Sequence, residues 1–99
     1  MRFVFLGVDG PGGVALRAEL RPAHAAYQEQ FGNPVGGPLR DRDGAVCGTM
    51  FVLEAATFDE AERRVQADPF VAAGLFAQWT LREFVAIDWP VPPPADTSS

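Results

Sequence analysis

Runs of alternating apolar and polar residues predict four strands. Residues 3–8 and 46–53 are apolar on both alternating faces, which is typical of strands that are covered on both sides and central in a sheet. Residues 35–39 form a poorer strand, because two glycines and a proline suit only a sheet edge. Residues 78–89 alternate well enough to form the last strand. The Asp43-Gly44 pair signals a hairpin turn between the middle two strands.

A helix is predicted over residues 21–31. Pro22 fits a first helical position, where its missing N–H would have no partner anyway, and Gly32 supplies a stop signal. Residues 14–20 can add a short helical turn before this helix, after a glycine-rich stretch at residues 9–13. That stretch lacks the spacing of a phosphate-binding motif, so we interpret it as a connection.

A second helix is predicted to start at Thr57. Thr57 and Glu60 form the Thr-x-x-Glu pattern of a capping box, and the apolar residues that follow recur at helical spacing. The Asp68-Pro69 pair ends this helix and can start another short one, since aspartate is a good N-cap and proline fits the next position. Gly74 is expected to close that turn.

The predicted order of elements is that of ferredoxin-like α+β folds: βαββαβ, with a four-stranded antiparallel sheet. The first and third strands are central in this topology, which agrees with their two-sided apolar pattern. Two helices cover only one face of such a sheet, so we predict a homodimer in which a second copy covers the other face. The domain is expected to span residues 1–89, followed by a proline-rich disordered tail at residues 90–99.

Composition and charge exclude several classes of function. The 99 residues carry a net charge of -5 and eight scattered basic residues, all of them arginine, so nucleic-acid binding is not expected. Without lysine, Schiff-base chemistry by a lysine side chain is excluded. The single cysteine, Cys47, forms no internal disulfide and is expected to be a small buried residue. The apolar run at residues 3–8 is too short for a membrane span or a signal peptide, so we predict a cytoplasmic protein without membrane association.

His24 is the only histidine and the best candidate for a chemically active group. His24, Tyr27 and Phe31 share one face of the predicted helix. In the first turn of a helix that begins at Pro22, the helix dipole would disfavour an imidazolium. The histidine is therefore expected to be largely neutral near pH 7 and able to accept a proton.

Several short motifs together resemble the YCII-related (YciI-like) family over nearly the whole chain, up to about Trp89. They are, in order, Arg21-Pro22-x-His24, Gly37-Pro38, Asp43-Gly44 leading into Gly48, Asp59-Glu60-Ala61, Asp68-Pro69-Phe70 and Ala73-Gly74. The resemblance implies a dimeric α+β-barrel architecture with a small-molecule cleft in each subunit, where His24 and the distant Asp68 lie close together. Most members have no assigned reaction; a related dehydrochlorinase acts on a chlorinated hydroxyhydroquinone, and muconolactone isomerase shares the broader fold.

A histidine and aspartate pair suits general acid/base chemistry. An aspartate that accepts a hydrogen bond from one imidazole nitrogen fixes the tautomer and leaves the other nitrogen free to take or give a proton. Such a pair would serve isomerisation, elimination or dehydrochlorination of a small cyclic or aromatic carbon acid. No metal or cofactor is expected, because a lone histidine is a poor metal site. The alternatives are a structural role for His24, an N-cap role alone for Asp68, and a non-catalytic ligand-binding or accessory module.

Five further residues are candidates for ligand contacts. Arg21 would orient a carboxylate or phenolate, or is simply a surface arginine at a helix start. Tyr27 either lines the cleft or packs in the core. Gly37 and Pro38 either let a ligand approach the backbone or blunt an edge strand. Phe70 follows Asp68 in the shared motif and is expected beside it.

Overall fold

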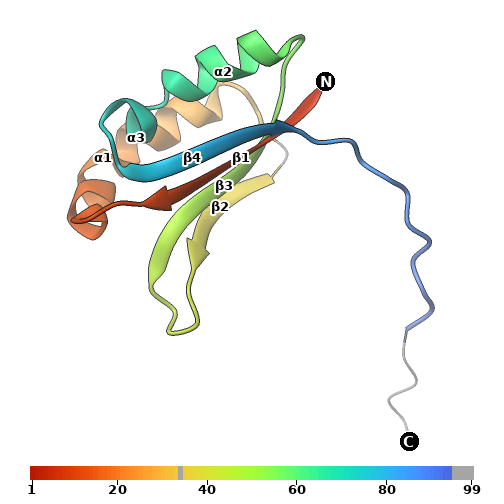
Figure 1. Ribbon diagram of the computed structural model, residues 1–99, viewed down its shortest axis with the longest axis horizontal. Helices are drawn as coiled ribbons and strands as arrows, with labels where there is room; N and C mark the ends of the chain where they lie inside the picture. The colour runs from red at the N-terminus through yellow and green to blue at the C-terminus, as the bar shows by residue number, and fades with distance from the viewer. Residues whose placement is uncertain (34, 95–99) are drawn as a thin grey trace, which may run out of the picture.

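The computed structural model describes residues 1–33 and 35–94 of the chain, which form a four-stranded antiparallel sheet and three helices (Figure 1). The elements are β1 (Arg2–Asp9), α1 (Gly13–Glu29), β2 (Val35–Arg40), β3 (Val46–Glu54), α2 (Phe58–Gln66), α3 (Pro69–Ala72) and β4 (Phe76–Glu83). The strand order is β2-β3-β1-β4, and the helices lie together on one face of the sheet (Figure 1). The predicted ferredoxin-like α+β fold is confirmed.

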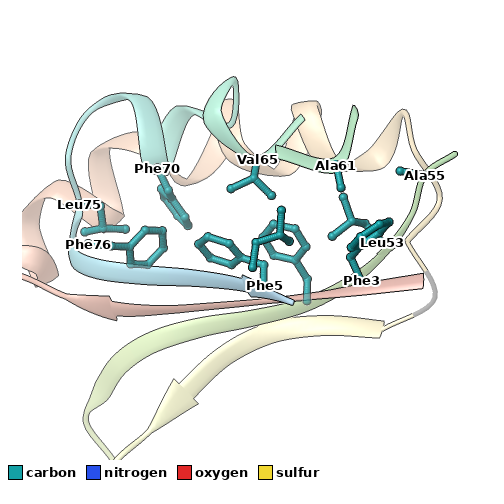
Figure 2. Packing of buried hydrophobic residues seen from close by; sticks show 11 residues of the cluster. Phe3, Phe5, Leu53, Ala55, Ala61, Val65, Phe70, Leu75 and Phe76 are labelled. Atoms are coloured by element: carbon teal, nitrogen blue, oxygen red, sulfur yellow. The ribbon is translucent and has the colours of Figure 1, made fainter. Parts of the chain in front are cut away.

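Strands β1 and β3 are central, as their two-sided apolar pattern predicts. They pair antiparallel with Phe5 opposite Phe51, and these two rings stack with their centroids 4.7 Å apart. Both belong to the buried core between sheet and helices (Figure 2), which also contains Phe3, Leu53, Ala55, Ala61, Val65, Phe70, Leu75, Phe76 and Leu81. Burial of one phenylalanine side chain contributes about 1.5–3 kcal/mol, so this cluster holds the helices on the sheet.

The opposite face of the sheet also carries apolar side chains, and no helix of the described residues covers it (Figure 1). Val4, Leu6 and Val8 alternate with the core residues of β1, and Leu6 and Val8 are 43% and 46% exposed. Met50 and Val52 continue the surface on β3, opposite Leu6 and Val4. We call these five residues the open-face patch.

The first helix is longer than predicted. α1 is one helix of 17 residues with Pro22 inside it, so the predicted start at residue 21 is wrong, and residues 14–20 belong to the same helix. Pro22 removes only one hydrogen bond of the helix. Leu16 and Leu20 pack against the core, so tertiary contacts hold the first half of the helix in place despite the proline.

The starts of α2 and α3 agree with the prediction. The Glu60 N–H donates to Thr57 Oγ1 at 3.1 Å, and the Ala56 N–H donates to the Glu60 carboxylate at 2.9 Å. The Phe70 N–H donates to Asp68 at 2.8 Å, which makes Asp68 the N-cap of α3. Side-chain caps satisfy backbone donors that a helix start otherwise leaves without partners.

The last strand is shorter than predicted, because its neighbour ends first. β4 ends at Glu83, which pairs with Phe3. One further backbone bond follows, from the Phe84 N–H to the Arg2 carbonyl. Beyond Arg2 the partner strand β1 has ended, so the alternating apolar residues of segment 85–89 are exposed instead of paired.

Residues 84–94 have no regular secondary structure and extend away from the domain (Figure 1). The predicted tail at residues 90–99 falls partly on residues 95–99, which lie outside the described residues, so the tail's disorder stays a prediction. Within the described part of the chain, no helix is long and apolar enough to cross a membrane.

Candidate active site

Helix α1 and the cap of α3 bring together the histidine and the aspartate that the sequence singles out. His24 Nδ1 lies 2.9 and 2.8 Å from the two carboxylate oxygens of Asp68, although the residues are 44 positions apart. Asp68 reaches this place because it caps α3, and α3 packs against α1. The two residues are therefore neighbours in space, while a catalytic role for them stays a prediction.

The Asp68 carboxylate is fully buried and accepts hydrogen bonds from three residues. The donors are the Phe70 N–H at 2.8 Å, the Gln28 side-chain amide at 2.6 Å and His24 Nδ1. A buried carboxylate is costly unless its oxygens are satisfied, so these donors allow it to occupy this position. Because Nδ1 faces an acceptor, we assign the proton of the neutral imidazole to Nδ1, which leaves a lone pair on Nε2.

Phe70 holds the imidazole ring from one side. The rings of His24 and Phe70 stack with centroids 3.9 Å apart and planes at 11°. The side chain of His24 is 18% exposed and that of Asp68 only 1%, so the imidazole is the accessible member of the pair. The predicted effect of the helix dipole on His24 does not apply, because α1 begins at Gly13 and His24 lies well inside the helix.

Two adjoining cavities lie between α1 and strands β2 and β3. They share His24, Gly37 and Thr49 and have volumes of about 380 and 340 Å³, a size that suits small molecules. The first, which we call the amide lobe, is also lined by Ala25, Gln28, Glu29, Gly32, Asn33, Gly36 and Phe51. The second, the arginine lobe, is also lined by Arg17, Arg21, Pro38, Arg40, Val46 and Phe70. His24 thus lies where the two lobes meet.

Arg17 is a buried part of the arginine lobe that the sequence reasoning missed. Its Nε and Nη2 donate to the two carboxylate oxygens of Asp9 at 3.1 and 2.6 Å, and its Nη1 donates to Thr49 Oγ1 at 2.8 Å. The planar guanidinium matches the two oxygens of a carboxylate. Its central carbon lies 5.1 Å from the centre of the Phe70 ring. The ring of Phe70 therefore lies close to both the Arg17 guanidinium and the imidazole of His24.

Gln28 was missed as well. Its amide N–H donates to Asp68, and its carbonyl oxygen accepts a hydrogen bond from the Asn33 side chain. The Asn33 oxygen in turn lies 3.4 Å from a guanidinium nitrogen of Arg64. This chain of contacts fixes the orientation of the Gln28 amide, so that its N–H points to the carboxylate.

A polar stripe on α1 was the available sequence signal for these residues. Arg17, Arg21, His24 and Gln28 recur at i, i+4, i+7 and i+11, which is the spacing of one helix face. The prediction of a helix start at Pro22 separated Arg17 from the others. A continuous helix from Gly13 would have shown all four residues together.

Four of the five predicted ligand contacts line the cleft, and the fifth does not. Arg21, Pro38 and Phe70 line the arginine lobe, and Gly37 lines both lobes. Tyr27 lines neither lobe, because its hydroxyl donates to the backbone carbonyl of Arg64 at 2.8 Å and its ring contacts Phe31 edge-on. Burial raises the pKa of Tyr27. These contacts support the packed alternative for this residue.

Cys47 is half-buried and not fully buried as predicted. It lines an open depression beside the start of α1, where the wall is formed mainly by glycines and small residues. Among residues 1–33 and 35–94, no three histidine, cysteine, aspartate or glutamate side chains gather as a metal site would require.

The family model of the YCII-related domain matches residues 1–85. Among solved structures, 5-chloro-2-hydroxyhydroquinone dehydrochlorinase (TftG) from Burkholderia phenoliruptrix, in complex with 2,5-dihydroxybenzoquinone, is similar with a TM-score of 0.78 and 33% identity, covering 86% of this chain and 94% of that one. A comparison with curated proteins gives no match.

A second solved structure is similar in fold. SnoaB, a cofactor-independent oxygenase from Streptomyces nogalater, has a TM-score of 0.54 and 18% identity, covering 89% of this chain and 93% of that one. At this identity the likeness concerns the fold alone. The predicted resemblance to the YCII-related family and to dimeric α+β-barrel proteins is confirmed at the level of sequence family and fold.

Proposed function

We propose, from the premise that the chain belongs to the YCII-related domain family, that this protein is a small cofactor-independent enzyme. His24 is the general acid/base, and Asp68 orients it. The substrate is a small cyclic or aromatic carbon acid, and the reaction is of the isomerisation or elimination type, dehydrochlorination included. The observation that carries the proposal is the 2.8 Å contact between His24 Nδ1 and Asp68 at the wall of the cleft.

The geometry supports separate tasks for the two residues. Asp68 keeps the proton on Nδ1, so Nε2 is the nitrogen that meets a molecule in the cleft. In a dehydrochlorination, Nε2 takes a proton from the substrate, and the electron pair of the broken bond to hydrogen moves into the substrate ring. Chloride then leaves with the electron pair of the carbon–chlorine bond. The substrate loses one proton and one chloride ion. The Asp68 carboxylate stabilises the imidazolium until the proton passes to water.

The similar dehydrochlorinase supports the reaction type and the class of ligand. It shares 33% identity with this chain over most of both chains, and its structure contains a dihydroxybenzoquinone. We therefore propose an oxygenated six-membered ring as the ligand of this protein. Phe70 stacks on the imidazole and is almost fully buried, so it holds the imidazole in place beside such a ring.

We also propose that the protein is a cytoplasmic homodimer in which two open-face patches pack together. Leu6 and Val8 of this patch are nearly half exposed, and burying apolar surface stabilises by about 25 cal/mol per Å². A two-fold contact uses the same patch on both copies. A mass measurement in solution that finds a monomer at micromolar concentration would contradict the dimer.

Turnover by variants tests the enzyme proposal. Wild type, His24→Ala and Asp68→Asn are compared on a panel of chlorinated hydroquinones, hydroxyquinones and lactones, with chloride release and ultraviolet absorbance as readouts. We expect each variant to lose about 10²–10⁴-fold in kcat, the usual contribution of a positioned acid/base. Asp59→Asn makes the same acid-to-amide change at an exposed position of α2, so it should keep wild-type turnover.

Two outcomes would contradict the proposal in different ways. If both variants are folded and turn over substrate like wild type, His24 and Asp68 are not the acid/base pair. If no compound is turned over but several raise the Tm of the wild-type protein by binding its folded state, the non-catalytic ligand-binding alternative is favoured.

A further inference from the structure

We propose that the arginine lobe binds an acidic substituent of the substrate, such as a phenolate, enolate or carboxylate, and that Arg21 and Arg40 select for its charge. The inference rests on the proposed function, because it concerns the substrate whose proton His24 moves. It narrows the substrate class from a small ring to a small cyclic anion. It also assigns an orientation to the bound substrate, whose acidic group lies in the arginine lobe.

The arginine lobe concentrates positive charge in an acidic protein. The whole chain has only eight basic residues and a net charge of -5, yet three arginines line this lobe, and none of its described lining residues is an acid. Asp9 neutralises Arg17 through two hydrogen bonds. Within the described residues, Arg21 and Arg40 form no ion pair with an acidic side chain. The lobe therefore has two uncompensated positive charges.

Arg21 and Arg40 come from opposite walls of the lobe. Arg21 lies on α1 one turn before His24, and Arg40 is the last residue of β2. Residues three apart on a helix are neighbours on its surface, so an anion held by Arg21 lies near the imidazole. A guanidinium presents parallel N–H donors that fit a carboxylate or the oxygens of a deprotonated hydroxyquinone.

The surface between these arginines is apolar. Pro38, Val46 and Phe70 line the same lobe. Phe70 is already buried, but an inorganic anion would leave Pro38 and Val46 in contact with water, whereas a ring would cover them, and covering apolar surface is favourable. The combination of cations and apolar walls therefore favours a cyclic organic anion over free phosphate or sulfate.

The amide lobe has the opposite charge character. Glu29 lines it together with the side-chain amides of Gln28 and Asn33, and none of its described lining residues is an arginine. An acidic group placed there would face the Glu29 carboxylate. Electrostatic repulsion from this lobe and attraction from the other would orient the substrate in one direction across His24.

Binding calorimetry at low salt tests this inference without any need for turnover. The probes are 2,5-dihydroxybenzoate and its methyl ester, which share a ring and differ in the carboxylate charge. We expect wild type to prefer the acid by about tenfold or more, and Arg21→Gln and Arg40→Gln each to weaken acid binding about three- to tenfold while ester binding changes little. Added sodium chloride should narrow the preference for the acid.

Arg63→Gln is the matched control, because it removes the same charge from an exposed position of α2. It should bind both probes as wild type does. Equal wild-type affinity for acid and ester, a preference that Arg21→Gln and Arg40→Gln leave unchanged, or no binding of either probe at millimolar concentration would overturn the inference.

These results are separable from a failure of the proposed function. If His24→Ala abolishes turnover but the wild type does not prefer the acid, the results support the enzyme proposal and contradict the proposed anion site. If the arginine variants lose the preference for the acid but no turnover is found, the results support the proposed anion site and contradict the enzyme proposal.

Discussion

Two carboxylates, Asp9 and the fully buried Asp68, hold helix α1 against the rest of the fold, and they differ in the partner that each one meets. Asp9 of β1 pairs with Arg17, and Asp68 at the cap of α3 pairs with His24. The side chains of the acids are 10% and 1% exposed. Both pairs border the arginine lobe through their basic members. Asp68 is more deeply buried than Asp9, but the chemistry of the partners is what separates a support from a candidate active site.

The difference lies in which groups can change between donor and acceptor. A guanidinium is always charged and has only donors, so Arg17 requires hydrogen-bond acceptors at residue 9. A neutral imidazole carries its proton on either nitrogen, and a side-chain amide offers both an acceptor and a donor. His24 can therefore change its tautomer to suit residue 68, whereas Arg17 cannot change its donors to suit residue 9.

Among the acid-to-amide variants, Asp9→Asn should have the largest effect on stability. The asparagine places an NH₂ group against the donors of Arg17 and leaves a buried guanidinium without its counter-charge. Breaking a buried pair in this way costs about 3–5 kcal/mol, and we expect a loss of about 3 kcal/mol in the free energy of unfolding, measured by urea denaturation.

A double variant provides the control for this prediction. Asp9→Leu combined with Arg17→Met replaces the ion pair by apolar side chains of similar size and should recover much of the lost stability, because such exchanges are often neutral. The exposed change Asp59→Asn should be close to neutral. A loss below about 1 kcal/mol for Asp9→Asn would show that the pair does not stabilise the fold.

Asp68→Asn should cost less, although Asp68 is the more deeply buried acid. The asparagine oxygen still accepts the Phe70 N–H as an N-cap, and its NH₂ can donate to His24 Nδ1 once the imidazole proton moves to Nε2. The Gln28 N–H loses an acceptor oxygen, so we expect a loss of about 1–2 kcal/mol. Asp68→Ala removes the cap and leaves Gln28 without its acceptor, so its loss should be larger, about 2–4 kcal/mol.

Nitrogen NMR of the imidazole distinguishes this rearrangement from a general loosening of the fold. His24 is the only histidine, so its two ring nitrogens are assigned without ambiguity. The proton should be on Nδ1 in wild type and on Nε2 in Asp68→Asn. An unchanged tautomer would show that the carboxylate does not set the orientation of the imidazole, and the proposed role of Asp68 would fail with it.

The sequence predicts the sheet well because its signals are local. The segments at residues 3–8 and 46–53 are apolar on both faces, and this property of their own sequence is enough to predict that they are central in the sheet. The start of α1 and the end of β4 were wrong for the opposite reason. Contacts of Leu16 and Leu20 with the core keep the helix continuous before Pro22, and β4 stops where its neighbour β1 ends.

The candidate site was predictable only in part. His24 stood out as a single residue, but its nearness to Asp68 was implied by a family resemblance and not by any local pattern. Arg17 and Asp9 lie on either side of a glycine-rich connection, and nothing in their spacing fixes how that connection folds. Gln28 depends on the same three-dimensional packing, because its partner Asp68 belongs to another helix cap.

The ion pair between Arg2 and Glu54 is exposed, and we expect it to stabilise the fold less than the pairs of Asp9 and Asp68 do. The Arg2 Nε donates to Glu54 at 2.8 Å, but the side chains are 46% and 55% exposed. The hydrogen bond from Arg2 lowers the pKa of Glu54. A lowered pKa means that the contribution to stability is present above the pKa of the unfolded chain and is lost as the pH falls through that of the folded protein.

Glu54→Gln should therefore lower the Tm only slightly at about pH 7, and the difference from wild type should shrink as the pH falls through the lowered pKa of Glu54, below which the carboxylate is protonated in both states. Tm measurements across this range at low salt check the prediction. An effect as large as that of Asp9→Asn would show that burial is not the property that separates strong from weak pairs in this fold. A difference that grows toward acid pH would contradict the sign of the pKa change at Glu54.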